Sequence, residues 1–156
     1  MEVLLFCGLQ AAGKSTYYRE HFASTHLLIS KDLMGKLGRK EQRQRELLHL
    51  ALAAGHCVVI DNTNATPAER VPLLEIAHSY GASVGGYYFR TTTGEALARN
   101  AQREADARVP PVALYSTAAR LLAPTYAEGF DSLYYVHIAA HSTRELPTWK
   151  IEEILR

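Results

Sequence analysis

The sequence predicts a three-layer α/β fold built on a mostly parallel sheet of about five strands. Its length of 156 residues suits a single domain, expected over residues 1–156, and its composition of 47% hydrophobic and 21% charged residues suits one buried core. Short apolar runs rich in β-branched and aromatic residues alternate with longer segments of helical periodicity. Because such alternation implies crossovers between parallel strands, we expect helices on both faces of the sheet.

The expected elements follow from these runs in chain order. The strands are expected at 3–7, 27–29, 57–60, 84–89 and 133–138, and the helices at 14–23, 41–54, 67–80, 94–107 and 112–123. The last two helices have no strand between them, so residues 94–123 are expected to form an inserted helical lid, bent at Pro110 and Pro111. Residues 148–155 are expected to form a final short helix.

Charge and composition exclude several classes of function. The chain carries 17 Lys and Arg against 16 Asp and Glu, a net charge of +1, so it does not bind nucleic acid through bulk positive charge. Cys7 and Cys57 each lie in an apolar run, which argues against a disulfide scaffold. The sequence has no apolar run long enough to span a membrane and no basic start typical of a signal peptide. We therefore expect a cytoplasmic protein with no membrane partner.

Residues 8–15 carry the sharpest motif, Gly-Leu-Gln-Ala-Ala-Gly-Lys-Ser, which matches the phosphate-binding P-loop pattern. The motif lies between the first expected strand and the first expected helix, where free backbone N–H groups and the helix dipole favour an anion. Lys14 is expected to reach the β- and γ-phosphates of ATP, and Ser15 to ligate Mg²⁺. The residues expected to bind nucleotide here are Gly8, Gln10, Ala11, Ala12, Gly13, Lys14, Ser15 and Thr16.

A candidate base follows the second expected strand. Asp32 comes directly after this strand, and the ends of parallel strands gather on the side where the phosphates bind. A carboxylate there can accept the proton of an attacking hydroxyl. Lys31 beside it is a candidate for binding an acceptor phosphate. The structural alternative is that Asp32 caps a short helix beginning at Leu33.

The third expected strand also ends in polar residues. Asp61 stands where a carboxylate can support Mg²⁺, and Asn62 and Asn64 are candidates for lining the acceptor site. The same segment reads as the start of a helix, with Thr66 as N-cap and Pro67 at the first helical position. The two interpretations are compatible, because Asp61 precedes the cap.

Arginines of the expected lid are candidates for neutralising the triphosphate. Arg99 and Arg103 are four residues apart and are expected on one face of the helix at 94–107. Guanidinium groups that close over the phosphates would stabilise the transition state and help to exclude water. The alternative is a solvated helix face on which they pair with Glu95 and Glu104.

With these residues in hand, the chain resembles the 5′-hydroxyl polynucleotide kinase family, and specifically the kinase module of the animal polynucleotide kinase-phosphatases. The resemblance covers most of the chain. It rests on the P-loop and on four further segments: 31–35, 60–64, 99–103 with Val109 and Pro110, and 123–130, Ala-Pro-Thr-Tyr-Ala-Glu-Gly-Phe. The last segment is the most specific of them.

The resemblance implies roles for individual residues. It implies that Lys14 is a phosphate ligand, Ser15 a Mg²⁺ ligand, Asp32 the general base and Arg103 the lid arginine. The bacteriophage member of this family has an arginine three positions after its catalytic aspartate, and this chain has Gly35 at that position. Binding of the acceptor phosphate is therefore expected from Lys31 and from the basic residues Lys36, Arg39, Lys40, Arg43 and Arg45, within a segment of net charge +3.

The expected function is transfer of the γ-phosphate of ATP, with Mg²⁺, to the 5′-hydroxyl ends of DNA or RNA in repair or end-healing. Any phosphatase or ligase that acts with it is expected to be encoded separately. Two alternatives stay open. One is a kinase for a small molecule such as a sugar, antibiotic or nucleotide-sugar, and the other is a nucleotide-dependent switch or non-catalytic ATP-binding module.

Overall fold

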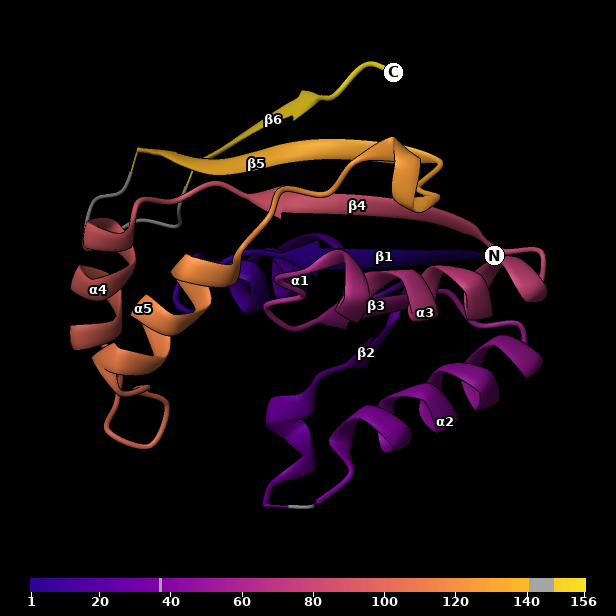
Figure 1. Ribbon diagram of the computed structural model, residues 1–156, viewed down its shortest axis with the longest axis horizontal. Coiled ribbons are helices and arrows are strands. Elements are labelled where there is room, and N and C mark those ends of the chain that lie inside the picture. The colour runs from indigo at the N-terminus through magenta and orange to yellow at the C-terminus, as the bar shows by residue number, and fades with distance from the viewer. Residues whose placement is uncertain (37, 141–147) are drawn as a thin grey trace.

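The computed structural model describes residues 1–36, 38–140 and 148–156 and contains one sheet of six strands (Figure 1). The sheet order is β2-β3-β1-β4-β5-β6, and the first five strands in sequence pair in parallel. The strands are β1 (Glu2–Cys7), β2 (Leu27–Ile29), β3 (Val58–Asp61), β4 (Ser83–Phe89), β5 (Ser132–Ala140) and β6 (Thr148–Glu153). The predicted α/β fold with a mostly parallel sheet is confirmed.

The expected helix at 148–155 is wrong, because this segment forms β6 at the edge of the sheet. β6 runs antiparallel to β5, with Trp149 opposite Ile138 and Ile151 opposite Val136. The ring of Trp149 packs edge-on against that of Tyr17, with 4.9 Å between their centroids. Pairing with β5 and this aromatic contact therefore favour a strand in residues 148–153, although the local sequence pattern favours a helix.

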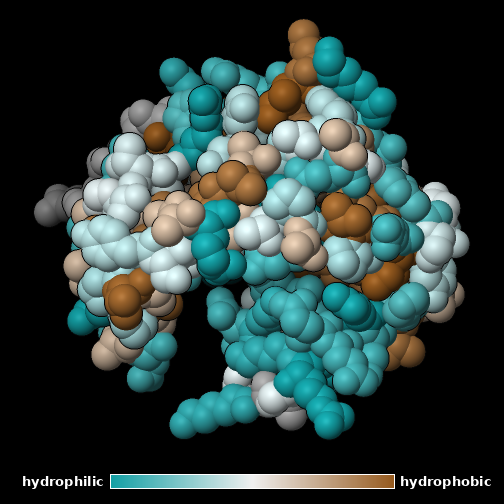
Figure 2. Space-filling view, viewed as in Figure 1, coloured by the Kyte–Doolittle hydropathy of each residue, from teal (hydrophilic) through white to brown (hydrophobic). Residues whose placement is uncertain are grey.

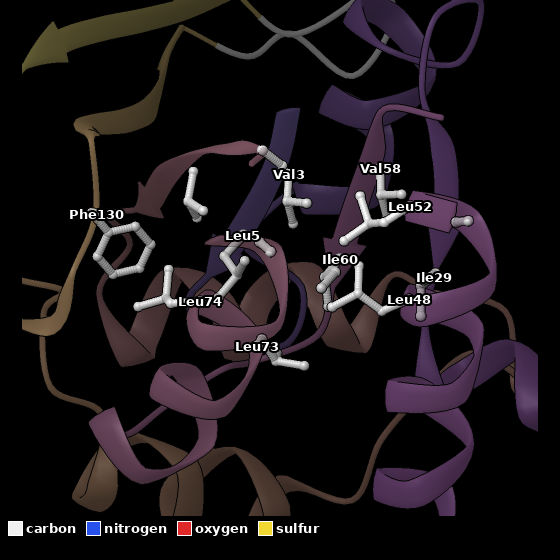
Figure 3. Packing of buried hydrophobic residues seen from close by; sticks show 14 of the residues in the cluster. Val3, Leu5, Ile29, Leu48, Leu52, Val58, Ile60, Leu73, Leu74 and Phe130 are labelled. Carbon is white, nitrogen blue, oxygen red and sulfur yellow. The ribbon is translucent and has the colours of Figure 1, made fainter. Parts of the chain in front are cut away.

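Helices cover both faces of the sheet. The helices are α1 (Lys14–His21), α2 (Lys40–Ala53), α3 (Pro67–Ser79), α4 (Thr93–Ala101) and α5 (Pro111–Arg120), with short 3₁₀ helices η1 (Lys31–Met34) and η2 (Tyr126–Glu128). On one face, Val3 and Leu5 of β1 pack with Leu48 of α2 and Leu74 of α3 (Figure 3). On the other face, Phe6 of β1 packs against Tyr17 of α1, so the molecule has three layers.

The lid lies beyond the carboxyl ends of β1 and β4, on the left in Figure 1. Its first helix was expected to continue to residue 107, but α4 ends at Ala101. The side chain of Asn100 is buried and bonds both backbone groups of Val109, at 2.7 Å and 3.0 Å. These two bonds close a loop over residues 101–108, which prevents the helix from continuing.

A buried arginine fixes the lid to the body of the protein. Arg70 of α3 is fully buried and forms a bidentate ion pair with Glu128 of η2, at 2.6 Å and 3.1 Å. Its remaining donor group bonds the carbonyls of Asn64, after β3, and Leu122, after α5, at 2.8 Å and 2.9 Å. We call this cluster of Arg70, Glu128, Asn64 and Leu122 the Arg70 junction. It holds together four segments: the loop after β3, α3, the end of the lid after α5, and η2.

Among the described residues, no helix is long and apolar enough to cross a membrane.

Candidate active site

The largest group of predicted site residues lines one cavity of about 730 Å³ at the carboxyl edge of the sheet. Figure 2 shows the hydrophilic hollow between the lid on one side and η1 with α2 on the other. The predicted residues that line it are Gln10, Ala11, Ala12, Gly13, Lys14, Ser15, Thr16, Lys31, Asp32, Asp61, Asn62, Asn64 and Arg103. Gly8, Arg43 and Arg99 do not line it.

The phosphate loop curls around the ammonium group of Lys14. Gly13 has a φ of 93° and begins α1 in a left-handed conformation that favours glycine. The Lys14 Nζ donates to the carbonyls of Gly8 and Leu9, at 2.8 Å and 2.6 Å. Gly8 does not line the cavity, but this position still requires a glycine. A Cβ there would lie 2.9 Å from the carbonyl oxygen of Phe89.

Burial and nearby charges set the protonation of Lys14. Burial lowers the pKa of Lys14 to about 8, and the Asp61 carboxylate opposes that shift. The side chains of Arg103 and Asp32 line the same cavity as Lys14. The structure thus brings the loop lysine, the candidate base and the lid arginine to one place.

Ser15 and Asp61 form an oxygen pair suited to a divalent cation. The Ser15 hydroxyl donates to Asp61 Oδ2 at 2.7 Å, and Asp61 is 6% exposed. Burial raises the pKa of the Asp61 carboxyl, while Lys14 and the bond from Ser15 act in the opposite direction. Hard oxygen ligands next to a phosphate loop fit Mg²⁺, which these two residues would hold. Ser15 and Asp61 are the two residues predicted as metal ligands, and the structure places them side by side.

Asp32 is exposed and lines the cavity. It does not cap a helix, so the structural alternative is wrong: η1 already begins at Lys31, and Ser30 is its N-cap. The Ser30 hydroxyl accepts the Asp32 N–H at 3.3 Å, a contact that involves the backbone of Asp32 and not its carboxylate. The geometry therefore keeps Asp32 available as a proton acceptor.

The polar residues near Asp32, namely Lys31, Asn62 and Asn64, form hydrogen bonds or ion pairs with other residues of the protein. The Lys31 ammonium group pairs with Glu41 of α2, and its backbone N–H donates to Asn62 Oδ1 at 2.9 Å. Asn62 in turn donates to Gln44 of α2. The amide of buried Asn64 donates to the Phe6 carbonyl at 2.8 Å. These contacts give Lys31, Asn62 and Asn64 structural roles alongside the predicted acceptor contacts.

The lid arginines differ in position. Arg103 lies in the turn after α4 and therefore does not share a helix face with Arg99 as expected. Arg103 lines the phosphate cavity together with Arg108, whereas Arg99 lines a separate cavity of about 600 Å³ beside β4 and β5. Arg43 is exposed on α2 and pairs with Glu46 at 3.4 Å. Its predicted acceptor contact would therefore lie outside the cavity.

Sequence reasoning missed Arg19, which also lines the phosphate cavity. It lies one helical turn after Ser15 on α1 and donates to the Thr16 hydroxyl at 3.1 Å. The spacing of four residues from a predicted metal ligand is the signal that would have found it.

Fold and site together define a class: the protein is a P-loop protein with the α/β architecture of P-loop kinases. The chain matches the AAA domain family over residues 3–123 and belongs to that family.

Three solved structures show the same fold at low sequence identity. Kti12 from Chaetomium thermophilum, in complex with ADP-AlF3, has a TM-score of 0.65 and 17% identity, over 86% of this chain and 88% of that one. A gluconokinase from Sinorhizobium meliloti has a TM-score of 0.63 and 17% identity, over 90% and 84%. A fungal RNA kinase has a TM-score of 0.68 and 14% identity, over 91% of this chain and 40% of that one.

Proposed function

We propose that the protein is an ATP- and Mg²⁺-dependent polynucleotide kinase that phosphorylates the 5′-hydroxyl ends of DNA or RNA. One observation carries the phosphotransferase part of the proposal. Lys14, the Ser15–Asp61 pair, Asp32 and Arg103 line a single cavity, although they come from four separate segments. Phosphoryl transfer needs from the protein chiefly these groups in this arrangement.

The residues act in distinct ways in the proposed reaction. Asp32 accepts the proton of the 5′-hydroxyl while the oxygen of that hydroxyl forms a bond to the γ-phosphorus of ATP. The bond between the γ-phosphorus and ADP breaks, and ADP leaves. Lys14 and Arg103 offset the charge that develops on the transferred group. Mg²⁺ held by Ser15 and Asp61 would neutralise further phosphate charge and orient the oxygens.

Three features favour a polynucleotide acceptor. The segment 123–130 resembles that of the polynucleotide kinases, and the fold is similar to that of a fungal RNA kinase. The cavity opens beside α2, whose described basic residues Lys40, Arg43 and Arg45 can contact a chain that extends beyond it. A small-molecule acceptor is the second candidate, because the fold is also similar to that of a gluconokinase.

Incubation with labelled ATP tests the proposal directly. Purified protein is given short DNA and RNA oligonucleotides with 5′-hydroxyl ends, the same oligonucleotides with 5′-phosphates, and a panel of sugars. The proposal predicts label on 5′-hydroxyl oligonucleotides alone. Label on a sugar alone would establish the second candidate, and release of inorganic phosphate alone would indicate a nucleotide-dependent switch.

Reversing the charges of Arg43 and Arg45 tests the role of α2. We expect the Arg43→Glu, Arg45→Glu variant to raise the KM for an oligonucleotide about tenfold, because two positive charges on α2 that attract the phosphate backbone become negative. The KM for a 3′-mononucleotide, which carries a single phosphate, is the matched control and should change much less. Equal KM values for the oligonucleotide in variant and wild type would exclude α2 from acceptor binding.

A further inference from the structure

Arg99 joins the lid to the phosphate loop by direct hydrogen bonds. Its Nη1 donates to the carbonyl of Ala11, at 3.2 Å, and to the hydroxyl of Thr91, at 3.0 Å. Glu95, one turn earlier on α4, approaches the same guanidinium at 3.9 Å. The guanidinium is thus held between the loop and the start of the lid, and its side chain is 29% exposed.

Ala11 is a position where the loop needs support. It is buried and has a φ of 61°, in the left-handed region that L-residues other than glycine rarely adopt. Such a conformation costs roughly 1–2 kcal/mol and persists only where the surroundings hold it. The hydrogen bond from Arg99 is a contact of this kind, because it acts on the carbonyl of the strained residue itself.

The peptide plane transmits this contact to the phosphate site. The carbonyl of Ala11 and the N–H of Ala12 belong to one planar unit and point in opposite directions. The Ala12 N–H donates to the Leu9 carbonyl at 3.3 Å, so Arg99 and Leu9 hold the same peptide from its two sides and fix the turn of the loop. Ala11 and Ala12 both line the phosphate cavity, whereas Arg99 lies outside its wall.

We propose that Arg99 is a positioning residue: by holding the Ala11–Ala12 peptide it keeps the turn of the phosphate loop in the shape that binds a polyphosphate. It acts on the loop and contacts neither the nucleoside nor the transferred phosphoryl group. The contact supports ground state and transition state alike, so its loss raises KM and leaves kcat nearly unchanged. The inference rests on the nucleotide-binding part of the proposed function and is independent of the acceptor. A second lid-to-loop contact, from Gln10 Nε2 to the Thr117 hydroxyl at 3.0 Å, lies next to it in the loop.

Binding of ATP and of inorganic tripolyphosphate to Arg99→Ala tests this role. Calorimetry should show both dissociation constants raised by the same factor, about tenfold, with kcat within about threefold of wild type. A loss of affinity for ATP alone would mean that Arg99 contacts the nucleoside, and would overturn the inference. A fall in kcat with unchanged affinity would also overturn the inference. The same holds if a folded Arg99→Ala variant keeps the kcat and the affinities of wild type.

Thr91→Val is the second variant, because Thr91 anchors the same guanidinium and lies outside the phosphate cavity. We expect it to weaken tripolyphosphate binding about threefold, and to have no effect when Arg99 is already alanine. Additive effects in the double variant would overturn the inference. Arg90→Ala is the matched control, since Arg90 stacks on Tyr135 at 4.1 Å and does not contact the loop.

The same titrations separate this inference from the proposed function. If wild-type protein binds neither ATP nor tripolyphosphate, the proposed function fails and the inference fails with it. If wild type binds both and Arg99→Ala binds them equally well, the inference alone fails.

Discussion

The Arg70 junction and the phosphate cavity both contain arginine and carboxylate side chains, but they differ in burial and in hydrogen bonding. At the junction, Arg70 is fully buried, and Glu128 and two carbonyls accept its hydrogen bonds at 2.6–3.1 Å. In the cavity, the guanidinium of Arg103 makes one hydrogen bond among the described residues, of 3.3 Å to the Ala107 carbonyl. Asp32 is exposed on the facing wall.

The difference shows which charges hold the fold and which can serve a ligand. A buried guanidinium whose donors all have protein partners stabilises the structure and cannot turn to a substrate. Groups around a cavity that keep donors and acceptors free can bind phosphate or a proton. The four predictions below test this contrast, from the largest expected effect to the smallest.

Asp32→Ala should reduce phosphoryl transfer by a factor on the order of 10⁴, because the attacking hydroxyl loses its proton acceptor. Binding of ATP should change little, since Asp32 is not part of the phosphate loop. Single-turnover kinetics measure the first effect and calorimetry the second. Turnover near that of wild type would remove Asp32 from the mechanism.

The reactivity of the Cys7 thiol should depend on its burial and on the charges of Arg70 and Glu128 at the Arg70 junction. Burial raises the pKa of Cys7 to about 12, with Arg70 opposing and Glu128 adding to the shift. At pH 8 we therefore expect Cys7 to react with a disulfide reagent about a thousandfold more slowly than an unshifted thiol. The folded state keeps a proton that the unfolded state loses, so stability should fall as pH rises from about 9 toward 12. Cys57, which is partly exposed, serves as the internal comparison.

Arg70→Met should lower the free energy of unfolding by about 3–5 kcal/mol, because Glu128 is left buried without its partner. Urea denaturation measures the change. Arg43→Ala is the matched control, since the Arg43–Glu46 pair is exposed and should contribute less than about 0.5 kcal/mol. Equal stabilities of the two variants would contradict a structural role for the junction.

Arg103→Ala should lower kcat about a hundredfold without changing the free energy of unfolding by more than about 0.5 kcal/mol. This is the opposite of the pattern expected for Arg70. Steady-state kinetics and urea denaturation on the same preparation test both parts. A variant that is unstable but turns over at the normal rate would place Arg103 with the structural arginines.

The sequence predicted the parts of the fold whose cause is local. Apolar runs predicted the five parallel strands, and the cap at Thr66 with Pro67 predicted the start of α3, where Thr66 and Glu69 form a capping box. The P-loop motif predicted the turn between β1 and α1. In each case the pattern of neighbouring residues is enough to predict the element, although pairing with distant strands and contacts such as Arg99 to Ala11 also hold it in the fold.

The parts it missed depend on distant contacts. Strand β6 forms because β5 offers an edge, and α4 stops at Ala101 because Asn100 bonds Val109. The most specific segment of the family resemblance, 123–130, contains Glu128, whose structural partner is Arg70, far away in sequence. Spacing along the chain likewise placed Arg99 beside Arg103, and only the fold shows that they line different cavities.

A crystal structure with Mg²⁺ and a non-hydrolysable ATP analogue tests the shared cavity most directly. We expect the triphosphate in the phosphate loop, with the Asp32 carboxylate facing the γ-phosphate across a gap that admits a hydroxyl group. A carboxylate turned away from the γ-phosphate, with no opening beside it for the end of an acceptor, would contradict the proposed kinase mechanism.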